Sequence, residues 1–221
     1  MKKLIISDTH LSSFNKRQFD FLKDLIESVD EVIINGDFWD GWCISFEKFV
    51  NSKWQDLFDL LLEKNTIYIY GNHDPKCLSD DRCALFAVET RDSYQFELFG
   101  QKFHCEHGHS LMTGLDMEDF INFYFKLFNR RPKVICYIIA KFERLLFTLF
   151  PRIASNSRLG QRTNEILREN LNTEHINIFG HSHSPDLDFA NNFINTGSIM
   201  CNNASYVIFD EDDIRLEKNK Y

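Results

Sequence analysis

Five short clusters of acidic, amide and imidazole side chains recur along this chain, and each closes or follows a short apolar segment. The clusters are Asp8-Thr9-His10, Gly36-Asp37-Phe38-Trp39-Asp40, Gly71-Asn72-His73-Asp74, His107-Gly108-His109 and Gly180-His181-Ser182-His183. The apolar segments are rich in β-branched and aromatic residues, which is typical of buried strands. In layered α/β proteins the ends of such strands are where ligands bind. The sequence therefore predicts a fold whose binding site is assembled from several strand ends.

The order of strand and helix patterns narrows the fold class. Short strands are predicted at 4–6, 32–34 and 66–70, with amphipathic helices at 14–29 and 46–63 between them. A hairpin follows at 94–105, and four more short strands are predicted at 176–183, 191–198, 205–210 and 213–217. Alternating strands and helices build buried sheets that are covered by helices. We therefore predict an α/β fold in which two sheets face each other with helices outside.

Residues 112–172 differ from the rest of the chain because they show no strand pattern. Between 126 and 168 there are ten Lys or Arg residues and two Glu residues, a net charge of +8, whereas the whole chain carries −8 and the remainder therefore −16. We interpret this basic, aromatic stretch as a helical cap inserted into a single domain that spans 1–221. Two roles remain open for it: a lid whose charges are only solvated, or a cap that closes over an anionic, partly apolar substrate.

Composition limits the partners and the location of the protein. The net charge of −8 disfavours a general nucleic-acid binder, because phosphate contacts need clustered Lys and Arg. The six cysteines form no Cys-x-x-Cys pair, so reduced, mostly buried thiols and a cytoplasmic location are expected. The apolar start of the chain is too short for a signal peptide. The chain also lacks an apolar run of about 18 residues, so no membrane-spanning helix is expected.

The mixture of donors in the clusters indicates a metal site. Carboxylate, amide and imidazole ligands together suit manganese, iron, zinc or cobalt, whereas calcium and magnesium sites use more oxygen. The clusters contain no cysteine, which argues against a structural zinc site. Residues i and i+2 of an extended segment point the same way. Asp8 with His10, and His181 with His183, are therefore expected to enter one cavity from extended backbone.

Five motifs, SDTH, NGDFWD, YGNHD, EHGH and GHSH, occur in this order and resemble those of the calcineurin-like metallophosphoesterases. The resemblance spans residues 8–183 and implies a four-layer αββα sandwich of two mixed β-sheets. It also implies two divalent ions that share the carboxylate of Asp37. The first ion would be bound by Asp8, His10, Asp37 and His183, and the second by Asp37, Asn72, His107 and His181. Manganese is the favoured metal, with iron, zinc and cobalt as alternatives.

The same resemblance implies the chemistry. Two divalent ions about 4 Å apart activate a water that attacks phosphorus. His73, oriented by Asp40, supplies a proton or a hydrogen bond to the leaving oxygen. Asp74 is expected to stabilise the turn rather than to bind metal. In the EHGH motif the family pattern favours His107 over His109 as the ligand.

Two features of the chain are similar to those of the UDP-2,3-diacylglucosamine pyrophosphohydrolases of lipid A synthesis. The first is the position of the insertion between EHGH and GHSH, and the second is the set of motifs SDTHLSS, GDFWDGW and GHSHSPDLD. This similarity implies hydrolysis of a phosphoester or pyrophosphate bond in a nucleoside-diphosphate or lipid-linked substrate. Ser157, Arg158 and Arg162 would contact the diphosphate, and the basic cap would bind the inner membrane surface peripherally. His73 departs from that subgroup, which usually carries arginine at this position.

Two other functions are kept open. A phosphodiesterase or nuclease would use the aromatic and arginine residues of the cap to hold a cyclic nucleotide or single-stranded nucleic acid. The acidic body of the chain disfavours a long nucleic-acid track. The third hypothesis is a binding module that has this fold without catalysis, and the complete ligand sets for both metals argue against it.

Overall fold

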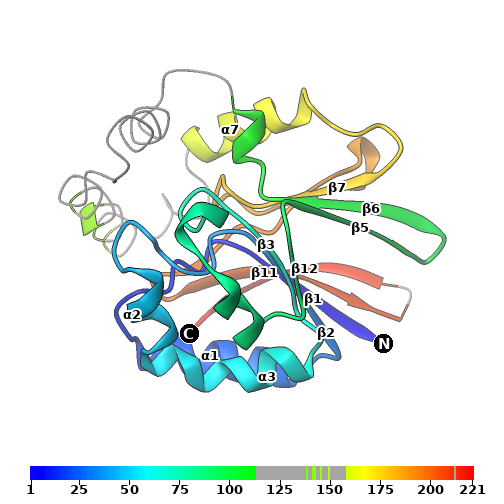
Figure 1. Cartoon of the computed structure of the whole chain (residues 1–221). Coiled ribbons are helices and arrows are strands. Elements are labelled where there is room, and N and C mark those ends of the chain that lie inside the picture. Colours follow the sequence, from blue (N-terminus) through cyan, green and yellow to red (C-terminus); the bar gives the residue numbers. More distant parts are fainter. Residues whose placement is uncertain (113–137, 139–140, 143–144, 146–148, 150–157, 212) are drawn as a thin grey trace.

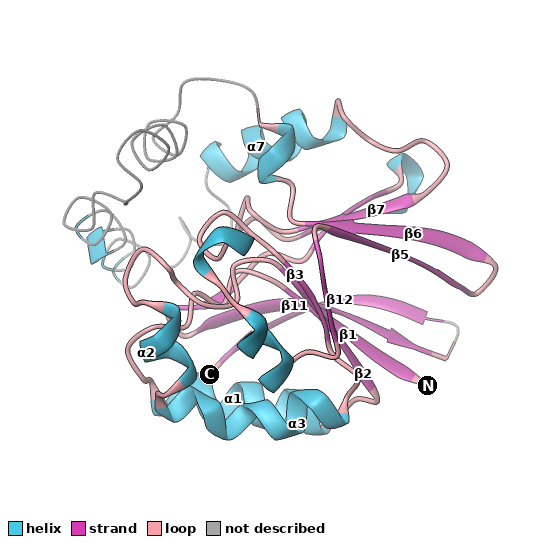
Figure 2. Cartoon of the chain, viewed as in Figure 1, coloured by secondary structure: helices cyan, strands magenta, loops and turns pink. Residues whose placement is uncertain are grey.

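The computed structural model describes residues 1–112, 138, 141–142, 145, 149, 158–211 and 213–221. Within these residues the strands form two mixed sheets (Figure 1, Figure 2), the larger with the order β10-β11-β1-β2-β3-β4 and with β12 paired to β11. Its strands are β1 (Lys2–Ile6), β2 (Glu31–Asn35), β3 (Ile67–Ile69), β4 (Glu89–Arg91), β10 (Ile199–Met200), β11 (Asn203–Asp210) and β12 (Asp213–Lys220). Strands β1, β2, β3 and β4 pair in parallel, so their carboxyl ends lie at one edge of the sheet.

The second sheet is five-stranded and has the order β5-β6-β7-β9-β8. Its strands are β5 (Ser93–Leu98), β6 (Gln101–Glu106), β7 (Ile176–Phe179), β8 (Asp186–Asp188) and β9 (Phe193–Asn195). The β5–β6 hairpin that was predicted from the sequence is confirmed, with Phe96 opposite Phe103. Strands β6, β7 and β9 are parallel, so their carboxyl ends also lie together.

Helices cover the outer face of each sheet, which gives the four layers of the expected αββα sandwich (Figure 1). The helices α1 (Lys16–Glu27), α2 (Phe46–Val50) and α3 (Phe58–Glu63) cover the seven-stranded sheet, and α7 (Arg158–Arg168) covers the five-stranded sheet. Short 3-10 helices are η1 (Lys53–Leu57), η2 (Lys76–Leu78), η3 (Asp81–Leu85), η4 (His109–Leu111) and η5 (Phe189–Asn191). The side chain of Asn15 begins α1 by accepting hydrogen bonds from the amides of Arg17 and Gln18.

Apolar side chains fill the three spaces between these layers. Leu4 and Ile6 of β1 pack toward the helices, whereas Ile5 packs between the two sheets, as the twofold period of a strand requires. Phe179 packs with Leu167 of α7 and with Phe193 of β9 on the outer face of the smaller sheet. Because both faces of the central strands are buried, they read as continuous apolar runs. Burial of each large side chain stabilises the fold by about 1.5–3 kcal/mol.

Some predicted elements differ from the structure. The helix predicted over 46–63 is interrupted after Val50, because the side chain of Ser52 accepts a hydrogen bond from the amide of Trp54 and starts η1. Strands β4, β8 and β10 were not predicted, and each is only two or three residues long. None of the five described cysteines forms a disulfide with another described residue. Only Cys83 and Cys105 are buried, so the expectation of mostly buried thiols is wrong for the described cysteines.

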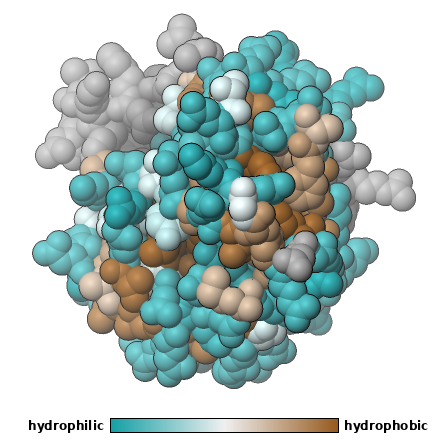
Figure 3. All heavy atoms as spheres, turned by 90° about the vertical axis from the view of Figure 1, so that its right-hand side faces the viewer, coloured by the Kyte–Doolittle hydropathy of each residue, from teal (hydrophilic) through white to brown (hydrophobic). Residues whose placement is uncertain are grey.

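Most of the predicted cap, 112–172, lies outside the described residues. The described residues at 138, 141–142, 145 and 149 are helical, and α7 forms the end of this stretch. Among the residues that the structure describes, no helix is long and apolar enough to cross a membrane. The face seen in Figure 3 is mixed, with apolar patches between hydrophilic residues.

Candidate metal centre

All five polar clusters lie at the carboxyl ends of parallel strands. Asp8 and His10 follow β1, Asp37 follows β2, and Asn72 and His73 follow β3 in the larger sheet. In the smaller sheet the 107–109 cluster follows β6 and the 180–183 cluster follows β7. The sandwich therefore brings three loops of one sheet against two loops of the other.

One group of ligand atoms forms around Asp8, His10 and His183. The Nε2 atom of His183 lies 3.1 Å from Oδ1 of Asp8. The Nε2 atoms of His10 and His183 are 3.2 Å apart. Oδ2 of Asp37 lies 3.7 Å from Nε2 of His10. These are the four residues that the motif resemblance assigns to the first metal ion.

The second group forms around the side-chain oxygen of Asn72. Oδ1 of Asn72 lies 2.9 Å from Nε2 of His107 and 3.1 Å from Nδ1 of His181. Oδ2 of Asp37 lies 3.3 Å from the same Nε2 of His107. The Asp37 carboxylate therefore lies between the two groups, which is the position that a shared ligand requires.

The buried carboxylate of Asp8 tests whether these residues fit a cation. Its Oδ1 is buried and lacks a hydrogen-bond partner among the described residues. Three imidazole nitrogens surround this atom, those of His183, His10 and His107 at 3.1, 3.8 and 4.0 Å. A buried carboxylate oxygen without a donor costs free energy unless a cation balances it. The donor set of carboxylate, amide and imidazole fits a divalent transition metal.

Most of the proposed ligands have an unusual backbone conformation. The φ angles of Asp8, His10, Asp37, His181 and His183 are 53°, 45°, 54°, 64° and 54°. The expectation that Asp8–His10 and His181–His183 are extended is therefore wrong, although both pairs do enter one site. Non-glycine residues in the left-handed region are strained and cluster at functional sites. Asp8 and His10, two residues apart and both left-handed, thus reach one group of ligand atoms together with His183.

Two glycines allow the loops to approach one another. Gly36 has a φ of 87°, and a Cβ built there would lie 2.5 Å from Cγ of His107. A Cβ at Gly71 would lie 2.5 Å from the amide nitrogen of Asp37. Gly36 thus allows the left-handed turn after β2, whereas Gly71 is needed for close packing against the neighbouring loop.

The sequence reasoning missed several residues that hold the ligands. The hydroxyl of Ser7 donates to Oδ2 of Asp8 at 2.5 Å. The carbonyl oxygen of Asn35 accepts a hydrogen bond from Nδ1 of His107 at 2.9 Å, which leaves Nε2 for a metal. The signal for both was their position, directly before a cluster.

The expected structural role of Asp74 agrees with its contacts. Its carboxylate accepts hydrogen bonds from the amides of Asp37, Phe38 and Gly71 at 3.0, 2.6 and 2.8 Å. These contacts join the loops after β2 and β3. Asp74 therefore fixes the position of the Asp37 ligand without facing the metal groups itself.

The site is strongly polarised. Burial alone would lower the pKa of His107, but the carboxylates of Asp37 and Asp8 raise it to about 10. Burial and the nearby His107 lower the pKa of His181 to about 3. Burial would raise the pKa of Asp8 and of Asp37, but neighbouring histidines hold both below their usual range. In the metal-free protein, a protonated His107 therefore balances ionised carboxylates.

The expected acid pair lies beside the metal groups. Nδ1 of His73 is 3.2 Å from Oδ1 of Asp40, and both side chains are buried. The rings of His73 and His10 meet edge to face, with centroids 4.5 Å apart. A nitrogen of His73 also lies within 4.8 Å of ligand atoms of His10 and Asp37. By contrast, His109 is outside these groups, and burial and His107 lower its pKa to about 4.

The predicted substrate residues lie on α7 or next to it. Arg158 and Arg162 are one turn apart and exposed, whereas Ser157 lies outside the described residues. Asn164 anchors this helix beside the last motif, because its Nδ2 donates to the carbonyl oxygen of Ser184 at 3.0 Å. The helix that carries the two arginines is thus tied to the loop that carries the GHSH ligands.

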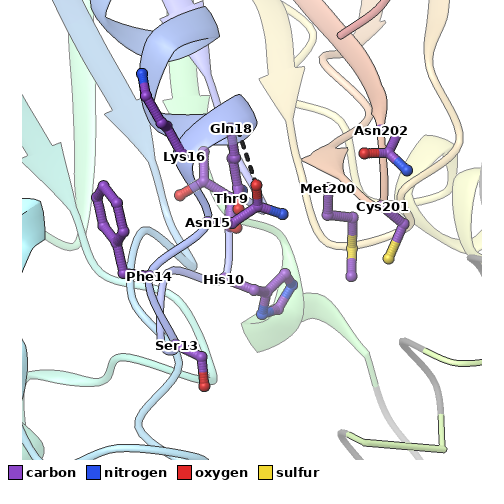
Figure 4. Close-up of a pocket in the computed structure, with 10 residues that line it drawn as sticks. All are labelled: Thr9, His10, Ser13, Phe14, Asn15, Lys16, Gln18, Met200, Cys201 and Asn202. Atoms are coloured by element: carbon purple, nitrogen blue, oxygen red, sulfur yellow. Dashed lines mark hydrogen bonds between the residues drawn. The ribbon is translucent and has the colours of Figure 1, made fainter.

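A cavity of about 600 Å³ opens next to His10 (Figure 4). The segment after β1 and the start of α1 line it, together with the end of β10 and the turn that follows. The lining residues are Thr9, His10, Ser13, Phe14, Asn15, Lys16, Gln18, Met200, Cys201 and Asn202. Its wall combines amide, hydroxyl, ammonium and apolar groups. This cavity is large enough for a substrate group beside the metal site.

A two-sheet sandwich with Asp, Asn and His ligands at facing strand ends defines a metal-dependent phosphoesterase. The chain belongs to the calcineurin-like phosphoesterases, because the model of that family matches residues 1–185. The family predicted from the five sequence motifs is thus confirmed. No curated protein matches the chain.

Solved structures are similar to the chain at low sequence identity, and YfcE shares its fold. YfcE, a phosphoesterase from E. coli, is 19% identical with a TM-score of 0.51, and the match covers 97% of this chain and 91% of that one. A single mutant of Vps29 from Entamoeba histolytica is 12% identical with a TM-score of 0.45, and the match covers 100% of this chain and 99% of that one. A predicted phosphoesterase from Streptococcus pneumoniae is 18% identical with a TM-score of 0.42, covering 99% and 88%.

Proposed function

We propose that this protein is a dinuclear metal-dependent phosphohydrolase that cleaves a phosphoester or pyrophosphate bond. The observation that carries the proposal is the position of Asp37 between two ligand groups. Its Oδ2 lies 3.7 Å from Nε2 of His10 and 3.3 Å from Nε2 of His107. The first ion would be held by Asp8, His10, Asp37 and His183, and the second by Asp37, Asn72, His107 and His181. Manganese suits this donor set, with iron, zinc and cobalt as alternatives.

Different residues of the chain would have different roles in the reaction. Two bound divalent ions would neutralise phosphate charge and lower the pKa of a water. A water oxygen forms a bond to phosphorus, and the bond from phosphorus to the leaving oxygen breaks. His73 gives a proton to that leaving oxygen, and Asp40, 3.2 Å from its Nδ1, holds the imidazole in place.

We further propose a nucleoside-diphosphate or lipid-linked substrate. Arg158 and Arg162 are exposed on a helix anchored beside the GHSH loop, which supports a contact with a diphosphate. The cavity of about 600 Å³ beside His10 offers room for one organic group of such a substrate. Ser157 is included in this proposal from its position in the sequence alone.

Peripheral binding to a membrane surface is part of the same proposal. Four described helical residues of the predicted cap are apolar and exposed: Ile138, Phe142, Leu145 and Leu149 are 59%, 64%, 56% and 62% exposed. Their spacing of four, three and four residues is the spacing of one helix face. The surrounding stretch, 126–168, has a net charge of +8. An apolar helix face among basic residues suits an anionic lipid surface.

Metal depletion and a ligand variant test the core of the proposal. The protein stripped with a chelator is expected to lose cleavage of a chromogenic phosphodiester, and added manganese is expected to restore it. Asp37→Ala is expected to remain inactive at saturating manganese, because both ligand groups lose one member. Full activity of Asp37→Ala would contradict the dinuclear site. A panel of lipid-diphosphate, nucleotide-sugar, cyclic-nucleotide and single-stranded DNA substrates then separates a pyrophosphohydrolase from a phosphodiesterase or nuclease.

A further inference from the structure

Trp42 lies against the face of His73. The two rings are stacked, with centroids 3.9 Å apart and planes inclined by 18°. Both residues are buried. The neighbouring Trp39 packs instead among the apolar residues between the larger sheet and its helices. The indole of Trp42 therefore packs directly on the imidazole of His73.

The backbone of Trp42 also contacts the pair of His73 and Asp40. Its amide donates to Oδ1 of Asp40 at 3.0 Å, and this is the oxygen that lies 3.2 Å from Nδ1 of His73. The next amide on the N-terminal side, that of Gly41, donates to the carbonyl oxygen of His73 at 3.0 Å. One short loop thus holds both the carboxylate and the imidazole.

The contacts of His73 leave its ring little freedom to rotate. One face lies on Trp42, one nitrogen faces Asp40, and the ring of His10 approaches edge-on at 82°. Rotation of the imidazole would break the stack and the contact with Asp40 together. Without the indole, the hydrogen bond to Asp40 would remain, but the ring could tilt about it. Small errors in the placement of a proton donor lower the rate strongly.

We propose that Trp42 is a positioning residue that fixes the plane of His73 for protonation of the leaving oxygen. The inference rests on the proposed function, because it assumes that His73 donates this proton. It adds a residue outside the metal ligands and the acid pair. The effect of Trp42 must then pass through His73 and must depend on how much the leaving group needs a proton.

Two variants and two substrates test the proposal. Trp42→Leu removes the aromatic face, whereas Trp42→Phe keeps one. We expect Trp42→Leu to lower kcat about tenfold for a phosphodiester with a phenolate leaving group, as part of the effect of general acid catalysis. For the p-nitrophenolate ester, which leaves without a proton, the loss is expected to be less than about threefold. Trp42→Phe is expected to restore most of the rate, and KM and manganese content to stay unchanged.

A double-mutant cycle gives the matched control. In the His73→Ala background, Trp42→Leu is expected to change kcat less than about twofold, because the group that it positions is gone. Equal losses for the two esters, or the same loss with and without His73, would overturn the proposal and assign Trp42 a general structural role. If the wild-type protein with manganese cleaves neither ester, the proposed function fails and this inference fails with it.

The stacking of Trp42 on His73 can also be measured without an activity assay. Ring protons of His73 over the indole face are expected to show an upfield ring-current shift in the NMR spectrum. Trp42→Leu is expected to remove the shift, while the circular dichroism spectrum and thermal unfolding show that the variant is folded. An unshifted His73 signal in the folded wild-type protein would contradict the stacking on which the proposal depends.

Discussion

Alanine substitutions at two glycines with similar backbone conformations test how closely the loops of the site pack. Gly36 and Gly100 have φ angles of 87° and 69°. In this left-handed region an alanine costs about 1–2 kcal/mol at either position. The surroundings differ, because a Cβ at Gly36 would lie 2.5 Å from Cγ of His107, whereas nothing lies within 4 Å of one at Gly100. Only Gly36→Ala must therefore displace a proposed ligand.

The expected magnitudes follow from these two terms. Gly100→Ala is expected to lower the free energy of unfolding by about 1–2 kcal/mol, which is the backbone term alone. Overpacking adds about 1–3 kcal/mol, so Gly36→Ala is expected to lose about 2–5 kcal/mol. Urea denaturation of the metal-free proteins measures both values. Calorimetric titration with manganese is expected to show the wild-type stoichiometry for Gly100→Ala and loss of the ion near His107 for Gly36→Ala.

The two variants also define the result that would refute this reasoning. If both lose the same stability and bind the same number of ions, backbone strain alone explains Gly36. The close approach of the β2 loop to His107 would then have no energetic role. A Gly36→Ala variant that keeps its stability but loses one ion would instead show that His107 moves freely.

Three further predictions concern the substrate, the membrane and pH. Replacing Arg158 and Arg162 with alanine is expected to raise KM for a lipid diphosphate about tenfold and to leave KM for a small chromogenic ester unchanged. Arg215→Ala on β12 is the control. Equal effects on both substrates would contradict a diphosphate contact. Phe142→Asp is expected to reduce sedimentation with vesicles of anionic lipid. Unchanged sedimentation would show that the exposed apolar residues around Phe142 do not contact the membrane. For the metal-free protein, the pKa of His107 is raised from 6.5 to about 10. The stabilisation from protonated His107 is therefore fully present below pH 6.5. As pH rises toward 10, the free energy of unfolding is expected to fall by a few kcal/mol, which urea denaturation across this range would detect.

The location of the site could be predicted because it depends on sequence signals that are local. Apolar runs followed by Asp37, Asn72 or His181 mark strand ends, and parallel pairing brings such ends together. The same reasoning found the hairpin of β5 and β6, since alternation with one buried face is a strong signal. These features need no knowledge of the partner strand.

Other features could not be predicted because they depend on contacts between distant segments. Strands β4, β8 and β10 have two or three residues each, and their existence depends on the neighbour that they pair with. The stack of Trp42 on His73 joins positions that follow two different strands. The left-handed backbone at Asp8 and His10 is strained, so local preference argues against it. The surrounding loops impose that conformation, and no local pattern reveals it.

The tautomer of His107 connects the pH dependence to metal binding. Its Nδ1 donates to the carbonyl oxygen of Asn35 at 2.9 Å, so the lone pair available for a cation is on Nε2. In the metal-free protein, Nε2 lies 3.3 Å from Oδ2 of Asp37, which attracts a proton there. A metal ligand must be deprotonated, so a cation and this proton compete for one nitrogen. The loss of stability between pH 7 and 10 is therefore expected only without metal, and its persistence at saturating manganese would mean that His107 is not a ligand.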